Sequence, residues 1–509
     1  MKKTVITLAV AVATFFAFSS CQMENLPNTS NNGVRVITAT FENDGTKTTL
    51  NAGTRTTLNA DGKTPEWAVG DKLRILDATT YQDVTLAAEN ITDNKITFTT
   101  TLTGSTLYAV YPASATTMEN CGDGNISFTI PAIQDGSFAS ANICVAKSST
   151  TDETNKDNLV FRNATSVLKI TTPAEVVGVD VTAANSIAGA VTASFSGSAV
   201  SLTTTDLDKN YVSAVGASAP TGNVFYLAVA PVETGSTDVN CYRAETKGSI
   251  NKGSKELQRN IIYSMDLASL TIDNSDLTGQ RGILNGQEYV VVKCGDKNLK
   301  WATKNIGADS ETDNGYYFFW AGTEGYVHNG SGWEKADGSG NLSNGFKYTN
   351  APYNDGSNYD WKKYNFTDMK GKLDSADDAA QSLLGAGWRM PASAEFTALI
   401  GATCWKWDAT DKGYYVYVPN PSTDAGKVNA GTGTYDKSNA LLFFPAAGNG
   451  ANNDLKYVES TGYYWSSTSG VPAPYLDESG SIALTIGSSM VQNGHTERQM
   501  GCSIRAVSE

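Results

Sequence analysis

The sequence predicts a mainly β protein whose last part is α+β, and three observations indicate this class. Charged residues make up 18% of the 509 residues, while 47 glycines and 14 prolines supply many turns. Short runs of alternating apolar and polar residues recur up to about residue 270, as half-buried strands require. Of the nine tryptophans, eight follow residue 300, which indicates a further domain of another kind.

The overall charge excludes one class of partner. The chain carries 38 Lys and Arg against 52 Asp and Glu, a formal net charge of −14. A surface with this excess of carboxylates does not attract a phosphate backbone. We therefore expect no nucleic-acid partner.

The beginning of the chain has the pattern of an export signal. Lys2 and Lys3 precede a mostly apolar, uncharged run over residues 5–18, and small residues follow it. This run is shorter than the roughly 20 residues that a membrane-spanning helix needs. The sequence predicts a signal peptide over residues 1–21 and no transmembrane segment.

The end of this signal resembles the lipobox of bacterial lipoproteins, in which a cysteine receives a diacylglycerol and becomes the mature N-terminus. The residues are Phe18-Ser19-Ser20-Cys21, with Phe where Leu is usual. The resemblance implies lipidation of Cys21 and a surface-exposed location on the outer membrane, because two or three acyl chains anchor a protein stably. Residues 22–33 are polar and predict a flexible tether. The alternative is an ordinary secretory signal that ends near a cysteine by coincidence.

Short strands separated by turns are expected from residue 34 to about 270. The first run places Ile37, Ala39 and Phe41 on one side, which predicts a strand with a largely apolar face. Similar runs occur at residues 72–76, 95–101, 106–111, 125–130, 160–170, 223–230 and 260–267. Clusters of Gly, Asn and Asp separate them, which indicates antiparallel strands in sandwiches.

The order of several motifs in this part resembles the fimbrillin family of pilins and pilin-like lipoproteins from anaerobic gut and oral bacteria. The motifs are Thr46–Leu50 (TKTTL), Pro65–Leu73 (PEWAVGDKL), Leu107–Pro112 (LYAVYP), Phe128–Pro131 (FTIP) followed by Gln134, and Ile262–Leu267 (IYSMDL). The resemblance implies two tandem, pilin-like β-sandwich domains. We expect them over residues 34–150 and 151–270, with the break in the polar run 148–158.

The same resemblance implies a way to assemble with other subunits. In polymerising fimbrillins an arginine-specific protease removes an N-terminal strand, and a strand from a neighbouring subunit fills the groove. An open sheet above an apolar trench completes its hydrogen bonds in this way. Residues 34–43 could be the removable strand, with processing at Arg55 in a Thr- and Gly-rich segment. The alternative for Arg55 is an ordinary exposed arginine in a loop.

The composition changes after residue 270. The polar residues 271–283 predict a linker, and residues 284–509 predict a loop-rich α+β domain. Short helices are expected over residues 375–384, with Ser375 as the N-cap, and over residues 393–400.

Six motifs in this last part resemble the Fibrobacter succinogenes major paralogous domain, a family akin to C-type-lectin-like folds. They are Leu299–Ala308 (LKWATKNIGA), Asp377–Ala380 (DDAA), Gly387–Pro391 (GWRMP), Phe443–Gly448 (FFPAAG), Tyr463–Ser467 (YYWSS) and Ser503–Val507 (SIRAV), with Ala506 where proline is usual. The resemblance implies a small scaffold that carries long variable loops. Trp388, Arg389, Trp465 and Arg505 are expected in the core of that scaffold.

The loops of this domain contain candidate ligand-contacting aromatic residues. Aromatic faces bordered by Asp and Asn can stack on sugar rings or anchor a protein interface. The candidates are Tyr316, Tyr317, Trp320, Trp333 and Tyr359. Residues 337–341 and 355–360 offer oxygen atoms of the kind that bind calcium, but neither forms a twelve-residue loop that ends in Glu, so ordinary Asx turns are preferred and no metal site is assigned.

Motifs for catalysis are absent from the sequence. With His328 and His495 as the two histidines, an HExxH zinc site cannot form, and no GxxxxGK[ST] phosphate-binding loop occurs. A Ser-His pair would depend on one of these histidines, and both lie near Gly and Asn, which favours the surface. We expect no enzyme, no catalytic residue and no cofactor.

The remaining cysteines allow disulfides in an exported protein. They are Cys121, Cys144, Cys241, Cys294, Cys404 and Cys502, and no CxxC motif occurs. Cys121 and Cys144 are the one pair that is close in sequence. We expect mostly buried free cysteines, with one disulfide possible.

Together these patterns predict a lipid-anchored surface protein with a pilin-like body and a lectin-like C-terminal domain. Our first hypothesis is a fimbrial tip or accessory adhesin that assembles with other fimbrillin subunits and binds a host or bacterial glycan or protein. A second is a non-polymerising surface lipoprotein that binds glycans. A third, remote hypothesis is a hydrolase or an enzyme of the formylglycine-generating type.

Overall fold

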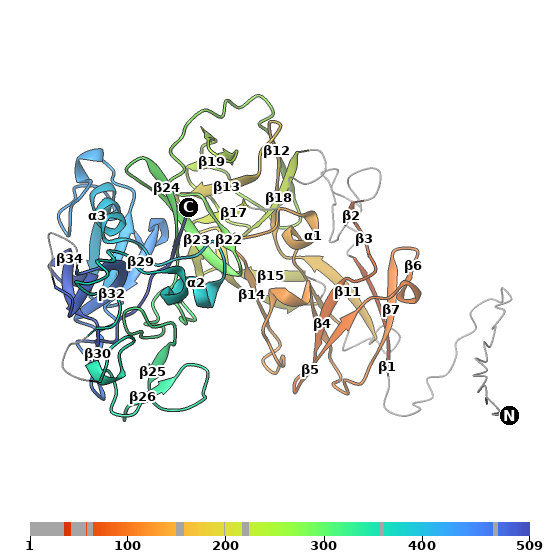
Figure 1. The fold of residues 1–509 in the computed structure, drawn as a ribbon. Coiled ribbons are helices and arrows are strands. Elements are labelled where there is room, and N and C mark those ends of the chain that lie inside the picture. Colours follow the sequence, from red (N-terminus) through yellow and green to blue (C-terminus); the bar gives the residue numbers. More distant parts are fainter. Residues whose placement is uncertain are drawn as a thin grey trace, which may run out of the picture.

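The structure is a computed structural model that describes residues 35–41, 57–58, 65–148, 157–197, 199–215, 223–356, 361–471 and 477–509. It is mainly β, with short helices concentrated in the last part, which confirms the predicted fold class (Figure 1). The N-terminal sheet, a middle region of three sheets and the C-terminal domain follow one another in space in the order of the chain (Figure 1). Among the described residues, no helix is long and apolar enough to cross a membrane.

The N-terminal sheet has eight strands in the order β5-β4-β8-β10-β11-β1-β7-β6. Their bounds are β1 Arg35–Phe41, β4 Lys72–Leu76, β5 Tyr81–Thr85, β6 Ile91–Thr92, β7 Lys95–Thr100, β8 Tyr108–Tyr111, β10 Cys144–Lys147 and β11 Asn158–Asn163. Side chains from both halves of the sheet share one core around Trp67, so the sheet folds over on itself. A short pair, β2 Thr57–Leu58 and β3 Pro65–Glu66, lies in the same part of the chain.

Strand β1 lies inside this sheet rather than at its edge. It pairs in parallel with β11, where Thr38 lies opposite Asn158, and antiparallel with β7, where Ile37 lies opposite Phe98. Ile37 and Ala39 are fully buried, whereas Val36, the residue before Ile37, is 58% exposed. The alternation that the sequence predicts for this strand is therefore present, with the apolar side facing the core.

The middle region contains three sheets around a second core. Their orders are β18-β12-β21, β17-β13-β19-β20 and β15-β14-β16, with β9 also paired to β14. The bounds are β9 Ile126–Ile130, β12 Ser166–Thr171, β13 Gly178–Ala183, β14 Ala188–Ser196, β15 Ala199–Thr203, β16 Leu207–Lys209, β17 Tyr211–Val215, β18 Val224–Val229, β19 Thr237–Tyr242, β20 Lys247–Asn251 and β21 Ile262–Asp266. A short helix, α1 Phe138–Ala141, contacts β18.

Two strands lie in a different region from the one that the expected boundary between residues 150 and 151 assigns them to. Strand β11 begins after that boundary, yet it pairs with β1 and β10 in the N-terminal sheet. Strand β9 precedes the boundary, yet it pairs with β14, and Phe128 lies in the middle core. The apolar alternation of a strand shows that one face is buried, but not which core receives that face. The run expected over residues 160–170 is likewise two strands, β11 and β12.

The described part of the C-terminal domain contains several small sheets and two α-helices. Its strands are β22 Arg281–Leu284, β23 Gln287–Cys294, β24 Lys297–Ala302, β25 Tyr326–His328, β26 Trp333–Lys335, β27 Cys404–Asp408, β28 Gly413–Tyr417, β29 Leu442–Pro445, β30 Asn449–Ala451, β31 Asp454–Lys456, β32 Thr461–Ser469, β33 Gly480–Gly487, β34 Met490–Glu497 and β35 Val507–Ser508. The last strand, β35, pairs with β24, so the first and last parts of the domain meet.

The helices of the C-terminal domain are α2 Ala379–Leu384 and α3 Ser393–Ala402. The expected N-cap, Ser375, is not the cap of α2. Asp378 takes that place, and its carboxylate accepts from the backbone N–H groups of Ala380 and Gln381. Single 3-10 turns complete the helical content at Ala88–Asn90, Ala113–Ala115, Tyr348–Asn350, Ser375–Asp377, Ser422–Asp424 and Lys437–Asn439.

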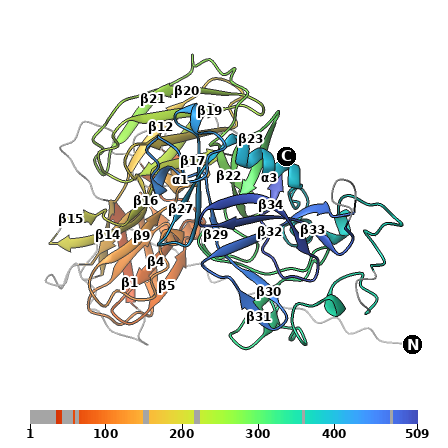
Figure 2. The ribbon, with the colours of Figure 1, turned by 90° about the vertical axis from the view of Figure 1, so that its left-hand side faces the viewer.

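Residues 271–283 are packed against both neighbouring parts, although the sequence predicts a polar linker. Ile272 is buried in the middle core and Leu277 in a core of the C-terminal domain. The backbone of Asn274 exchanges two hydrogen bonds with Lys247 of β20. Figure 2 shows β17 of the middle region beside β22 of the C-terminal domain, and the two strands are in contact. We call residues 271–281 the connector.

None of the six described cysteines forms a disulfide, and all six are buried. Cys144 belongs to the core of the N-terminal sheet, whereas Cys121 belongs to the core of the middle region. The two thiols therefore lie on different sides of the sheet, and the disulfide that the sequence allows between them is not formed.

Candidate binding site in the C-terminal domain

Three of the five aromatic residues expected to contact a ligand are buried instead. Tyr317, Trp320 and Trp333 are each less than 4% exposed. Each donates a hydrogen bond to a backbone carbonyl: Tyr317 Oη to Ala447 at 2.5 Å, Trp320 Nε1 to Ser466 at 2.8 Å and Trp333 Nε1 to Asn452 at 3.0 Å. These rings build the scaffold and offer no face to a ligand, because their apolar area and their polar atoms are already used inside it.

The other two candidates have different outcomes. Tyr316 is half-buried and lines a hollow described below. Tyr359 lies outside the described residues. The expectation that Trp388, Trp465 and Arg505 belong to the core is confirmed, since each is no more than 1% exposed. Arg389 is half-buried and forms a two-pronged ion pair with Glu395 at 2.6 and 2.7 Å.

Two neighbouring hollows lie in the loop region of this domain. The first, which we call the Asp377 hollow, has a volume of about 370 Å³ and is lined by Glu324, Tyr326, Tyr353 and Asp377 among others. The second, which we call the Tyr316 hollow, has a volume of about 440 Å³. Thr323 and Glu324 line both hollows, so these two residues separate them. Volumes of this size suit a small ligand or one side chain of a partner.

Asp377 is held rigidly at the first hollow. Its carboxylate accepts hydrogen bonds from the hydroxyls of Tyr353 and Tyr364 and from Nζ of Lys363. Burial raises the pKa of Asp377, but these hydrogen bonds, above all that of Lys363, outweigh it and hold the pKa below its ordinary value. Asp377 is therefore a fixed negative charge at neutral pH.

Glu324 provides a second fixed carboxylate between the hollows. It accepts from Oη of Tyr326 at 2.6 Å and pairs with Nζ of Lys335 at 2.7 Å. Burial raises the pKa of Glu324, whereas the hydrogen bonds from Lys335 and Tyr326 lower it below its ordinary value. The hydroxyl of Tyr326 is correspondingly harder to ionise, since burial and Glu324 both raise its pKa.

The backbone around the Asp377 hollow is strained. Ala321 and Tyr353, which both line it, have φ angles of +63° and +60°, in the left-handed region that non-glycine residues rarely adopt. Such strain costs on the order of 1–3 kcal/mol per residue and is concentrated at binding sites and active sites in general. Together with the fixed carboxylates of Asp377 and Glu324, these two strained residues make this hollow a candidate recognition site.

The residues that line the hollows are suited to binding. Their tyrosine hydroxyls, paired carboxylates and amide groups can hold a polar ligand, and Phe319 and Pro352 add apolar area. Within the described part of the chain, no cluster of His, Cys, Asp and Glu is arranged to hold a metal ion. Asp337, one of the residues considered for calcium, instead accepts from the backbone N–H of Ser339 at 2.8 Å in an Asx turn.

The sequence analysis did not single out Tyr353, Glu324 or Asp377 as ligand contacts. Asp377 was noticed as part of the motif before α2, but its neighbours Tyr353 and Lys363 come from a loop 14 to 24 positions earlier. A one-dimensional pattern carries no signal for this convergence. The positive φ angles, which would have indicated the site, are a property of the folded chain.

Comparison with known proteins gives structural matches of low similarity. A structure from Bacteroides uniformis, described as a proposed cell adhesion protein, has 15% sequence identity and a TM-score of 0.29, covering 48% of this chain and 97% of that chain. A fimbrial protein from Bacteroides ovatus has 10% identity and a TM-score of 0.22, covering 93% and 99%. The tip fimbrial protein from Porphyromonas gingivalis, truncated at its C-terminus, has 8% identity and a TM-score of 0.23, covering 40% and 91%.

At such identities and TM-scores these likenesses transfer neither a family nor a function to this chain. No family model matches the sequence. No curated protein matches it either.

Proposed function

We propose that this protein is a fimbrial tip or accessory adhesin whose C-terminal domain binds a glycan or a protein. One observation carries the proposal: the chain continues from the middle region through a packed connector into a further, C-terminal domain. Ile272 and Leu277 of the connector are buried, and Val507 of the last strand is fully buried. In polymerising fimbrillins the end of the pilin part supplies the donor strand. Here that position is occupied by a further domain, which favours a terminal subunit over a repeating one.

The N-terminal sheet supports assembly with other fimbrillin subunits by strand complementation. β1 lies between β7 and β11, and its departure would expose two unpaired strand edges and the space left by Ile37 and Ala39. Such a groove accepts an extended segment from another subunit because the ladder and the apolar contacts are then restored. Processing at Arg55 is part of this proposal; Arg55 lies outside the described residues, between β1 and β2 in sequence.

The proposed location is the cell surface, with the protein anchored in the outer membrane by acyl chains on Cys21. Residues 1–34 lie outside the described residues, so this part of the proposal rests on the sequence pattern. N-terminal analysis of the mature protein from cells tests it: an acylated Cys21 means a tethered molecule, whereas a start at Thr56 means a processed pilin.

The position in a fimbria is tested by immunogold labelling of assembled fimbriae with antibody against the C-terminal domain. We expect gold particles at fimbrial ends and co-purification of the protein with a shaft subunit. Uniform labelling along the shaft would contradict a terminal position.

Ligand binding by the C-terminal domain is tested with the whole chain on a glycan array and on host cells. Tyr353→Phe and Glu324→Gln remove one hydroxyl or one charge from the Asp377 hollow, and each is expected to weaken binding roughly tenfold. Tyr457→Phe, at a 58% exposed tyrosine elsewhere in the domain, is the matched control. Unchanged binding by both hollow variants would show that recognition lies elsewhere.

A second candidate function is a non-polymerising surface lipoprotein that binds glycans. The observation that favours it is that β1 already completes the N-terminal sheet within a single chain. Failure to co-purify with any pilin, together with glycan binding by the whole chain, would support this alternative over the first.

A further inference from the structure

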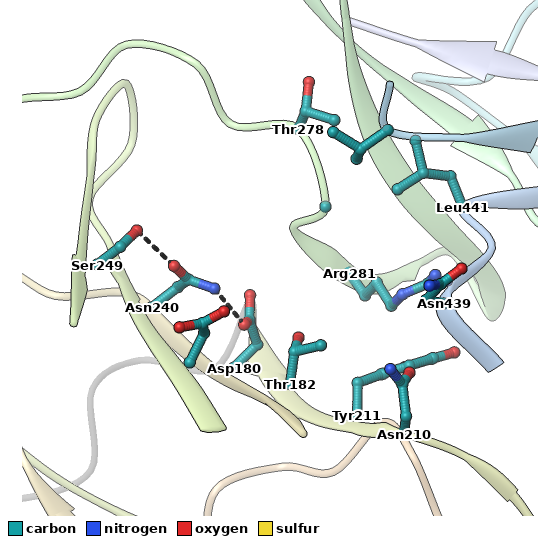
Figure 3. Close-up of a pocket in the computed structure, with 13 residues that line it drawn as sticks. Asp180, Thr182, Asn210, Tyr211, Asn240, Ser249, Thr278, Arg281, Asn439 and Leu441 are labelled. Carbon is teal, nitrogen blue, oxygen red and sulfur yellow. Dashed lines mark hydrogen bonds between the residues drawn. The ribbon is translucent and has the colours of Figure 1, made fainter. Parts of the chain in front are cut away.

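A cavity of about 390 Å³ lies between the middle region and the C-terminal domain, separate from the two hollows described above. We call it the junction cavity. Strands β13, β17, β19 and β20 form one wall, and the connector and the C-terminal domain form the other (Figure 3). Its volume lies at the lower end of the range for small-molecule sites, which is about 300–1,000 Å³.

The sheet side of the cavity presents an ordered row of polar side chains. Figure 3 shows Ser249, Asn240, Asp180 and Thr182 following one another along this wall. Ser249 Oγ donates to Asn240 Oδ1, and Asn240 Nδ2 donates to Asp180 Oδ1 at 2.7 Å. The hydroxyl of Tyr242 also donates to Asp180. The row is thus fixed in place before any ligand arrives, which reduces the entropic cost of binding.

Several polar groups in the cavity have unused hydrogen-bonding capacity. The hydroxyls of Thr182 and Tyr211 have no hydrogen-bond partner among the described residues, and neither is sealed from solvent. Arg281 lies with its Cζ atom 4.0 Å from the centre of the Tyr211 ring and donates from one Nη atom to the carbonyl of Ala440 at 2.7 Å. Its Nε and other Nη atom have no acceptor among the described residues. These donors and acceptors are available to a ligand.

The two walls are held together by direct contacts. Ser213 Oγ donates to the backbone carbonyl of Arg281 at 3.0 Å, and Lys209 Nζ pairs with Glu311 at 3.4 Å across the junction. Arg281 itself reaches from the connector to Ala440 of the C-terminal domain. The cavity is therefore an integral part of the interface and not a gap between loosely joined parts.

We propose that the junction cavity binds an uncharged saccharide unit. Amides and hydroxyls on the sheet wall can donate to and accept from sugar hydroxyls, while Leu441 and Val418 provide apolar area for the C–H face of a ring. Two carboxylates, Asp180 and Asp238, disfavour a phosphate, and the guanidinium of Arg281 disfavours an ammonium group. The site is independent of the hollows that serve the proposed adhesin function.

The test uses the whole purified chain with glucose, galactose, mannose and N-acetylglucosamine as probes, measured by saturation-transfer NMR and calorimetry. Thr182→Val and Tyr211→Phe each remove one hydroxyl and keep the shape of the side chain. Thr192→Val on β14 and Tyr226→Phe on β18 are matched controls outside the cavity. Glu324→Gln and Tyr353→Phe change the Asp377 hollow and leave the junction cavity unchanged, so they test whether a sugar binds in that hollow instead of in the junction cavity.

We expect at least one of these sugars to bind, and we expect Thr182→Val and Tyr211→Phe each to weaken its binding roughly tenfold. The two controls and the two hollow variants should bind it as the parent does. The proposal is overturned if none of the four sugars binds, if the cavity variants bind as tightly as the parent, or if inorganic phosphate binds instead with the same dependence on Tyr211.

Discussion

Asp180 shows how a single buried group sets a pH dependence. Burial raises the pKa of its carboxyl to about 6, although hydrogen bonds from Tyr242 and Asn240 and the charges of Lys247 and Arg281 act in the opposite direction. Because the folded chain holds the proton more tightly than the unfolded chain, ionisation of Asp180 works against folding. This unfavourable contribution to the free energy of folding is absent below pH 3.8, the ordinary pKa of an aspartate, and is complete above about pH 6.

We predict that the parent chain loses stability relative to Asp180→Asn as the pH rises from about 4 to about 6, and that the difference is then constant. Urea unfolding of both chains at a series of pH values measures it. Asp238→Asn, which removes an exposed carboxylate from the neighbouring strand β19, is the matched control. A stability difference between the parent and Asp180→Asn that stays constant between these pH values, or that changes in the opposite direction, would contradict the raised pKa of Asp180.

Individual side chains also show which burial a sequence pattern predicts and which it does not. Trp388, Trp465 and Arg505 were correctly predicted as core residues because they lie in compact motifs with apolar neighbours. Trp320 and Trp333 were expected to contact a ligand because they lie in or beside predicted loops, but both are buried. Whether an aromatic side chain in or beside a loop faces the core or the solvent depends on tertiary contacts, which a sequence pattern does not contain.

Strand β1 is an element whose two sides have opposite roles. Ile37 faces the core and is fully buried, whereas Val36, the preceding residue, is 58% exposed. The period of two in a strand means that the same substitution at these neighbouring positions should have very different effects.

We predict that Ile37→Lys destabilises the N-terminal sheet by about 3 kcal/mol or more, because it buries an unpaired charge. Val36→Lys should change the stability by no more than about 0.5 kcal/mol. Hydrogen exchange of peptides from β7 and β11 measures this, with at least about a hundredfold faster exchange expected for Ile37→Lys. Equal exchange in the two variants would show that β1 is not packed in the sheet.

The start of α2 depends on Asp378. Besides capping the helix, its carboxylate accepts from the backbone N–H of Met390 at 2.9 Å. Asp378 therefore connects the start of α2 to the GWRMP segment. This double role explains why Asp378, and not the expected Ser375, is the N-cap.

We predict that Asp378→Ala lowers the free energy of unfolding of the C-terminal domain by about 2 kcal/mol, because both the cap and the Met390 contact are lost. Asp374→Ala is the matched control: its side chain is 42% exposed and forms surface ion pairs with Lys363 and Lys370, so a much smaller loss is expected because solvent screens these pairs. Tryptophan fluorescence during urea unfolding follows this domain, since eight of the nine tryptophans lie in it. Equal effects of the two substitutions would contradict the capping role.

Within the part of the chain that the structure describes, burial protects the thiols. The six described cysteines form no disulfide and are buried, and burial raises the pKa of Cys121 and Cys241 to about 12 and that of Cys294 to about 11. Since the thiolate is the reactive form, these groups should be inert in the folded protein.

We predict that a native chain beginning after Cys21 shows almost no reaction with a chromogenic disulfide reagent, and that six thiols react after unfolding in urea without reductant. Ser331→Cys, at an exposed loop position, should add one rapidly reacting thiol and serves as the positive control. Fewer than six reactive thiols in the unfolded chain would reveal a disulfide.

Much of the architecture follows from the sequence by itself. Alternation of apolar residues predicted nine of the 21 strands described between residues 34 and 270, because burying one face of a strand requires a period of two. The concentration of tryptophan after residue 300 determined that a different domain begins there. These are local or compositional properties, and they do not depend on which parts of the chain meet.

Tertiary structure alone decided how these elements are shared and where ligands could be held. It assigned β9 to the middle region and β11 to the N-terminal sheet, and it turned the expected linker into a packed connector. It also brought Tyr353 to Asp377, and Tyr211 to Arg281. Such pairings join distant parts of the chain, and they are selected by the burial of whole surfaces, for which no short segment of sequence carries the information.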